Sequence, residues 1–96
     1  MITQYDRNGF RMDFVNGYSI SVIWHQGSYS DNRADNMPTS SSVEVGIFPT
    51  MVSTNKFIFP DSMFNPQETN DPMPYVDIEL LAKLISWTQG LRSVTQ

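Results

Sequence analysis

Hydrophobic and polar residues alternate along residues 10–24, FRMDFVNGYSISVIW, on both sides of the pair Asn16-Gly17. Asn-Gly between two such runs is the strongest short-range signal for a β-hairpin. A three-residue loop ending at Gly17 places Met12 opposite Ile20 and collects the apolar side chains on one face, whereas a two-residue turn would divide them between two faces. Because a one-residue slip turns every side chain to the other face, the pattern predicts the three-residue loop, with Gly17 in the left-handed conformation.

Further strands are predicted on both sides of this hairpin. Residues 2–5 are expected to form a short first strand, and the turn residues 6–9 would join it to the hairpin as a meander. Residues 43–48 alternate again, with Pro49 ending the strand, and residues 56–59 form another short β-like run after a turn at 53–55. Four prolines exclude helix from residues 60–75, which we expect to be an extended connector.

The last predicted element is a helix that starts after Asp77, a favourable N-cap residue. Apolar residues recur at helical spacing in a wide arc made of Ile78, Leu80, Leu81, Leu84, Ile85, Trp87, Thr88 and Leu91. Gly90 is expected to stop the helix in the left-handed conformation. The sequence therefore predicts an α+β fold: an antiparallel four- or five-stranded sheet, opening as a meander, with one C-terminal helix packed on one face, in a single domain over residues 1–96.

Composition narrows the classes of function. The 96 residues are 40% hydrophobic and 17% charged, which is typical of a globular chain. A net charge of −4 argues against a protein that binds nucleic acid by neutralising phosphates. Without cysteine there is neither a disulfide nor a thiolate ligand. Since no apolar run approaches a membrane span and the N-terminus lacks signal-peptide features, we expect no membrane partner and a cytoplasmic location.

Candidate catalytic and metal-binding residues lie just after the hairpin. His25 is the only histidine, and Ser28 and Asp31 would complete a formal Ser-His-Asp set, but no nucleophile-elbow pattern surrounds them. Residues 31–36 resemble a calcium loop, yet Arg33 stands where an oxygen ligand is required and the glycine and distant glutamate are missing. We therefore expect no enzyme, no metal and no cofactor, and keep a minor hydrolase using His25 as the weakest alternative.

Two segments are candidates for binding a partner. Residues 25–42 form a polar connection that is longer than most loops within a domain, and such loops are usually functional or mobile. The span between Lys56 and Lys83 contains acidic residues and no basic residue. One interpretation is that this acidic span engages a basic protein surface. The other is that carboxylates near a helix N-terminus are favoured by the helix dipole and that acidic residues keep the protein soluble. The predicted partner-binding residues are Tyr29, Asp31, Arg33, Asp35, Asp61, Glu68 and Asp71.

The run FVNGYSISVIWHQGSYSDNR resembles the opening of a family of small accessory proteins from tailed bacteriophages. These have an NGY-x-[IV]-S-V hairpin, a Gly and a Tyr, a polar insertion, a strand like VEVGIF and a short C-terminal helix. Members often carry Cys where this chain has Ser30, and their third strand usually continues into aromatic and charged residues where this chain has Pro49. The resemblance implies phage origin and an accessory role, and it carries over no catalytic residue.

Together these patterns favour a phage accessory protein that acts by protein–protein binding in the host cytoplasm. The expected partner is a host protein or complex, such as a defence nuclease complex inhibited in the manner of an anti-CRISPR protein, and a homo-oligomer is left open. The alternative is a protein that sequesters a small nucleotide signal, with Trp24, Tyr29 and Arg33 as the stacking and anion-binding set.

Overall fold

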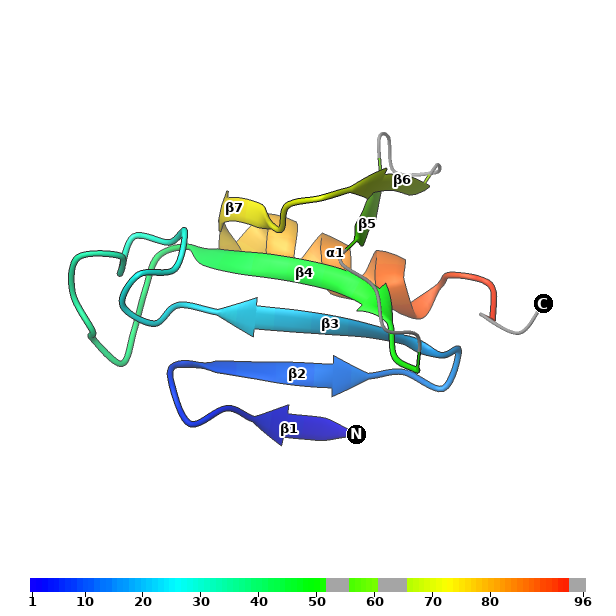
Figure 1. Cartoon of the computed structure of the whole chain (residues 1–96), viewed down its shortest axis with the longest axis horizontal. Coiled ribbons are helices and arrows are strands. Elements are labelled where there is room, and N and C mark those ends of the chain that lie inside the picture. The colour runs from blue at the N-terminus through cyan, green and yellow to red at the C-terminus, as the bar shows by residue number, and fades with distance from the viewer. Residues whose placement is uncertain (52–55, 61–65, 94–96) are drawn as a thin grey trace.

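The computed structural model describes residues 1–51, 56–60 and 66–93, apart from the side chains of residues 66 and 67. The elements within these residues are β1 (Ile2–Gln4), β2 (Gly9–Asp13), β3 (Tyr18–Ile23), β4 (Val43–Pro49), β5 (Phe57–Pro60), β6 (Pro66–Thr69), β7 (Met73–Val76) and α1 (Ile78–Gln89). Five strands form one antiparallel sheet in the order β1-β2-β3-β4-β7, and α1 lies across one side of it (Figure 1). The predicted α+β class is thus confirmed.

The hairpin of β2 and β3 has the predicted register. Met12 pairs with Ile20, and the loop closes where the amide of Phe14 donates to the carbonyl of Tyr18 at 2.9 Å. Gly17 has a φ of 89°, the left-handed conformation that the loop requires. The alternation of apolar and polar residues therefore determined the pairing, as expected for a sheet with one buried face.

The two faces of the sheet differ in composition because successive side chains in a strand point in opposite directions. One face carries the core, whose fully buried members on β3 and β4 are Ile20, Val22, Val45 and Ile47. The alternate positions form the opposite face, which we call the open face: Thr3, Tyr5, Arg11, Asp13, Ser19, Ser21, Ile23, Glu44, Gly46 and Phe48.

Helix α1 begins as predicted but buries a narrower stripe than predicted. The Asp77 side chain accepts a hydrogen bond from the amide of Leu80 at 2.8 Å, which caps the first turn. Only Leu84 and Thr88 are fully buried, while Ile78 is 71% exposed, so its assignment to the buried arc was wrong. The reason is positional: α1 starts one residue after β7, at the edge of the sheet, and its first turn lies beside the sheet's margin (Figure 1).

The end of α1 also differs from the prediction. Gly90 has a φ of −86°, in the right-handed region, so the left-handed stop was wrong. The side-chain amide of Asn16 instead donates to the carbonyls of Thr88, Gln89 and Leu91 at 2.9, 3.2 and 3.1 Å. Since the last carbonyls of a helix lack partners within it, this contact from the hairpin loop replaces the expected cap.

The proline-rich connector predicted for residues 60–75 contains two strands, so that prediction was wrong in part. β6 pairs with β5, and β7 pairs with β4 at Val43–Val76 and Val45–Met73. The β5–β6 pair lies beside β4 (Figure 1), with Phe59 buried in the core cluster. The predicted turn at 53–55 lies outside the described residues. The described part of the chain includes no helix long and apolar enough to cross a membrane.

Candidate functional site

The loop that follows β3 is held in place by Asn32, whose side chain is 3% exposed. Its amide nitrogen donates to the carbonyls of Trp24 and Met37 at 2.7 and 2.8 Å, and its amide oxygen accepts from the amide of Met37 at 3.0 Å. Ser28 and Ser30 are also buried and hydrogen-bond each other at 2.8 Å. Buried polar side chains with satisfied partners therefore give this predicted binding loop a defined conformation.

Tyr29 stands at the outer side of this loop, 49% exposed, with its backbone fixed from two strands. Its amide donates to a carboxylate oxygen of Glu44 on β4 at 3.1 Å, and its carbonyl accepts from the amide of Tyr75 on β7 at 2.8 Å. The guanidinium of Arg33 lies 4.5 Å from the centre of the Tyr29 ring and donates to the carbonyl of Gly27 at 2.9 Å. A half-exposed aromatic ring is thus presented on a rigid support.

Tyr29 borders a depression of about 440 Å³ that it lines together with Asp71, Pro72 and Pro74. We call these four residues and Arg33 the Tyr29 surface. Three of the predicted partner-binding residues, Tyr29, Arg33 and Asp71, meet here, although the sequence assigned them to two separate segments. The neighbouring Tyr75 is 52% exposed and has a φ of 50°, a strained conformation for a residue other than glycine.

The remaining predicted partner-binding residues have other surroundings. A carboxylate oxygen of Asp31 accepts a hydrogen bond from the Ser41 hydroxyl, and Asp35 is exposed in the same loop. Glu68 lies on β6, where it forms a 3.5 Å ion pair with Lys56. Asp61 lies outside the described residues. The predicted acidic span is therefore partly neutralised at Glu68 and retains a carboxylate at the Tyr29 surface through Asp71.

The formal Ser-His-Asp set is not assembled. His25 Nδ1 lies 2.8 Å from the carbonyl of Gln26, and the Ser28 hydroxyl donates to the backbone carbonyl of His25 at 2.6 Å, not to its ring. Among the described residues, no group of three or more metal-ligating side chains gathers. Trp24, which was assigned with Tyr29 and Arg33 to a set that binds a nucleotide, packs edge-on against Phe10 and donates to the carbonyl of Pro38 at 3.0 Å.

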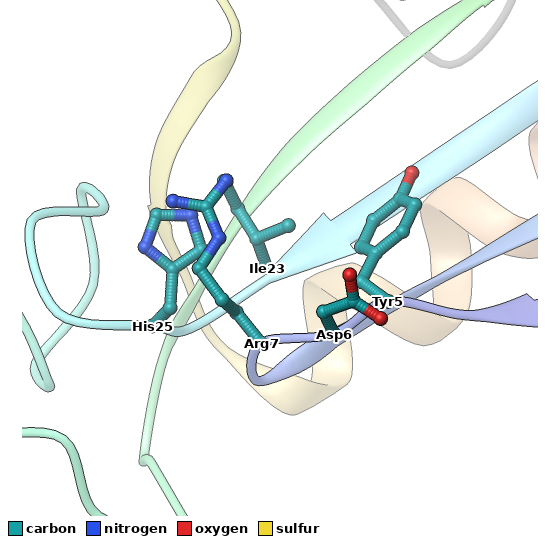
Figure 2. A pocket seen from close by; sticks show the side chains of 5 residues that line it. All are labelled: Tyr5, Asp6, Arg7, Ile23 and His25. Atoms are coloured by element: carbon teal, nitrogen blue, oxygen red, sulfur yellow. The ribbon is translucent and has the colours of Figure 1, made fainter.

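A second hollow, which the sequence did not predict, lies at one end of the open face. It has a volume of about 300 Å³ and is lined by Tyr5, Asp6, Arg7, Ile23 and His25, which we call the Arg7 pocket. Figure 2 shows the Arg7 and His25 side chains extending to the same side from two different segments. The alternation could have placed Tyr5 and Ile23 on the same face of the sheet, but it carries no signal for the approach of Arg7 and His25.

Comparison of this chain with family models, with curated proteins and with solved structures finds no match. The function must therefore be inferred from the two surfaces just described.

Proposed function

We propose that this chain is a protein-binding module that engages a basic partner through the Tyr29 surface. The observation that carries this proposal is the rigid presentation of Tyr29, whose amide, carbonyl and ring are each held by a different residue. Tyrosine is enriched among residues that dominate binding energy, because it offers a large contact area and has few rotatable bonds to immobilise. A prearranged ring also lowers the entropic cost of association.

The depression beside Tyr29 fits the side chain of a lysine or arginine. The Asp71 carboxylate supplies the opposite charge, and Tyr29, Pro72 and Pro74 supply apolar contact for the aliphatic stem. One cation, the guanidinium of Arg33, already lies against the Tyr29 ring, so the partner's charge is directed to Asp71. The net charge of −4 favours the approach of a basic surface over a longer range. The backbone is strained at Tyr75, whose amide donates to the carbonyl of Tyr29, and such strain is typical of functional positions.

The partner class follows from the resemblance to phage accessory proteins. On that basis the partner is a host protein or complex with a basic surface, such as a defence nuclease complex, and binding inhibits it. The chain would act in the host cytoplasm by occupying that surface, without turnover.

The test is capture of the partner from host lysate, followed by affinity measurement with the purified partner. Tyr29→Ala and Asp71→Lys should each weaken binding about tenfold or more, since they remove the aromatic contact and reverse the charge in the depression. Asp6→Lys is the matched control, because it makes the same charge change at an exposed residue outside the Tyr29 surface. It should leave the affinity within about threefold.

Salt supplies a second criterion. A contact between an acidic surface and a basic partner weakens as ionic strength rises, because exposed charges are screened beyond about 8–10 Å at physiological salt. The affinity of the Asp71→Lys variant for the partner should fall less steeply with rising salt than the affinity of the Asp6→Lys variant. If both reversals weaken binding equally, general charge attraction and not the Tyr29 surface explains the interaction.

A further inference from the structure

The Arg7 pocket continues into a second hollow. This hollow has a volume of about 280 Å³ and shares Asp6, Arg7 and His25 with the first, while its remaining lining comes from the polar side chains of Asn8, Gln26 and Asn36. The first hollow has an apolar floor formed by Tyr5 and Ile23. One end of the combined site is therefore suited to a flat apolar group and the other to a polar group, with Arg7 and His25 at the junction.

The site is built by the fold and depends on the absence of a side chain at Gly9. A Cβ atom there would lie 2.9 Å from the Tyr5 ring, 2.9 Å from the Ile23 side chain and 2.8 Å from the carbonyl oxygen of Val22. The close approach of Tyr5 and Ile23 over the glycine forms the floor. The Tyr5 hydroxyl is in turn hydrogen-bonded to the Ser21 hydroxyl at 2.8 Å, which fixes the ring.

The turn that carries Arg7 is tied to the segment that carries His25. The amide of Trp24 donates to the carbonyl of Asn8 at 3.0 Å, and the amide of Tyr5 donates to the carbonyl of Gly9 at 3.1 Å. The Asn8 side chain also donates to the carbonyl of Met37 at 2.6 Å. The two sides of the site are therefore held at a fixed spacing, which reduces the cost of ordering them around a ligand.

The charged groups of the site have no partners of their own. Across the described residues, the side chains of Asp6 and Arg7 make neither a hydrogen bond nor an ion pair, even with each other. His25 Nδ1 lies 2.8 Å from the carbonyl oxygen of Gln26, which can only accept, so the tautomer that satisfies this contact has its proton on Nδ1 and offers Nε2 as an acceptor. The site thus offers one guanidinium for an oxyanion, and an imidazole nitrogen and a carboxylate for hydroxyl or amine donors.

From these groups we infer a small-molecule site at the Arg7 pocket for a phosphorylated ligand with a flat ring, of the size of a nucleoside monophosphate. The phosphate lies against Arg7, sugar hydroxyls donate to His25 Nε2 and Asp6, and the ring lies on Tyr5 and Ile23. This site is separate from the Tyr29 surface, so its occupancy does not depend on the proposed protein partner.

The experiment is a ¹H–¹⁵N NMR titration of the full chain with adenosine 5′-monophosphate, with adenosine and inorganic phosphate as partial probes. The nucleotide should produce saturable shifts at the amides of residues 5–9 and 23–26. Arg7→Gln should weaken its binding about tenfold or more, since a charge-assisted hydrogen bond is lost. Arg92→Gln, the same substitution at an exposed arginine after α1, is the matched control and should bind like the unmodified chain.

The same spectra report whether each variant is folded, so loss of binding cannot be mistaken for loss of structure. Adenosine should bind the unmodified chain more weakly than the nucleotide does. Because adenosine lacks the phosphate, it should bind Arg7→Gln with the same affinity as it binds the unmodified chain. The inference is overturned if the nucleotide gives no saturable shifts, if the shifts map to other residues, or if Arg7→Gln and Arg92→Gln bind it equally. None of these results would test the proposed binding of a protein partner at the Tyr29 surface.

Discussion

The two faces of the sheet are made by the same strands and yet are stabilised differently. On the face covered by α1, Ile20 and Ile47 pair across β3 and β4 and are completely buried, so apolar burial is the main contribution. On the open face, Ser19 is equally buried but polar. Its hydroxyl donates to an Asp13 carboxylate oxygen at 2.5 Å and lies 2.6 Å from the Thr50 hydroxyl.

The open face can be polar because its groups satisfy one another. Asp13 also accepts from Arg11 at 2.7 Å, and the Arg11 guanidinium lies 5.2 Å from the centre of the Phe48 ring. Among the described residues, no buried side-chain nitrogen or oxygen lacks a hydrogen-bond partner. The apolar face therefore supplies most of the stability. The open face does not need to be covered over its whole area, and this leaves room at its end for the Arg7 pocket.

The largest expected effect tests the apolar face. Leu84→Asp places an unpaired charge where the side chain is 1% exposed, and should lower the free energy of unfolding by about 4 kcal/mol or more. A domain of this size is stabilised by only about 5–15 kcal/mol, so much of the protein should unfold. Thermal unfolding followed by circular dichroism measures this.

The matched control is Lys83→Asp, which places the same side chain on the exposed side of α1. It should change the free energy of unfolding by about 0.5 kcal/mol or less. Similar melting temperatures for the two variants would mean that α1 does not contribute to the core through Leu84.

A smaller effect is expected on the open face, where the β5–β6 pair contacts β4 through Gly46. A Cβ atom at Gly46 would lie 2.8 Å from an atom of the Phe57 ring, so Gly46→Ala forces Phe57 to move. We expect a loss of about 1–3 kcal/mol in the free energy of unfolding, measured by urea denaturation. The backbone itself tolerates alanine, since Gly46 does not have a positive φ.

Phe57→Leu provides the control for this steric explanation. In the double variant the smaller side chain should make Gly46→Ala less costly, which a double-mutant cycle detects as a coupling energy. Additive effects of the two substitutions would show that Phe57 does not press on Gly46.

The same contrast explains which parts of the fold could be predicted. The β2–β3 hairpin was predictable because its alternation decides both the strands and their register. β6 and β7 were missed because prolines argue against strands, and this argument fails at a strand's first residue and on an edge strand. Pro66 is the first residue of β6, and β7, which contains Pro74, is at the edge of the sheet.

The candidate sites were predictable only in part, for a different reason. Tyr29 and Asp71 were identified from loop length and charge, but their meeting depends on the pairing of β7 with β4, which the sequence did not indicate. The Arg7 pocket joins residues from the β1–β2 turn to residues after β3. No local pattern encodes that meeting, and it depends on the glycine at position 9 lying beneath Tyr5.

The smallest expected effect concerns the pH dependence that the open face gives to stability. The hydrogen bond donated by the Ser19 hydroxyl, followed by that from Arg11, lowers the pKa of Asp13 below its ordinary value of 3.8. A carboxyl whose pKa is lower in the folded state stabilises the fold above its unfolded pKa, and this contribution is lost as the pH falls through the folded pKa. Stability should therefore decrease below about pH 4, and Asp13→Asn should flatten that decrease.

Separate variants of the two partners make this prediction sharper. Ser19→Ala should raise the pKa of Asp13 towards its ordinary value, because the serine hydrogen bond is the largest single cause of the lowering, and Arg11→Gln should raise it through loss of the second hydrogen bond and of the guanidinium charge. The Asp13 carboxyl can be followed by NMR during an acid titration of each variant. If Arg11→Gln has the larger effect, the ion pair and not the buried serine controls Asp13. The open face would then be held by a surface charge pair, a weaker and more salt-sensitive contact than the hydrogen-bonded network inferred from Ser19.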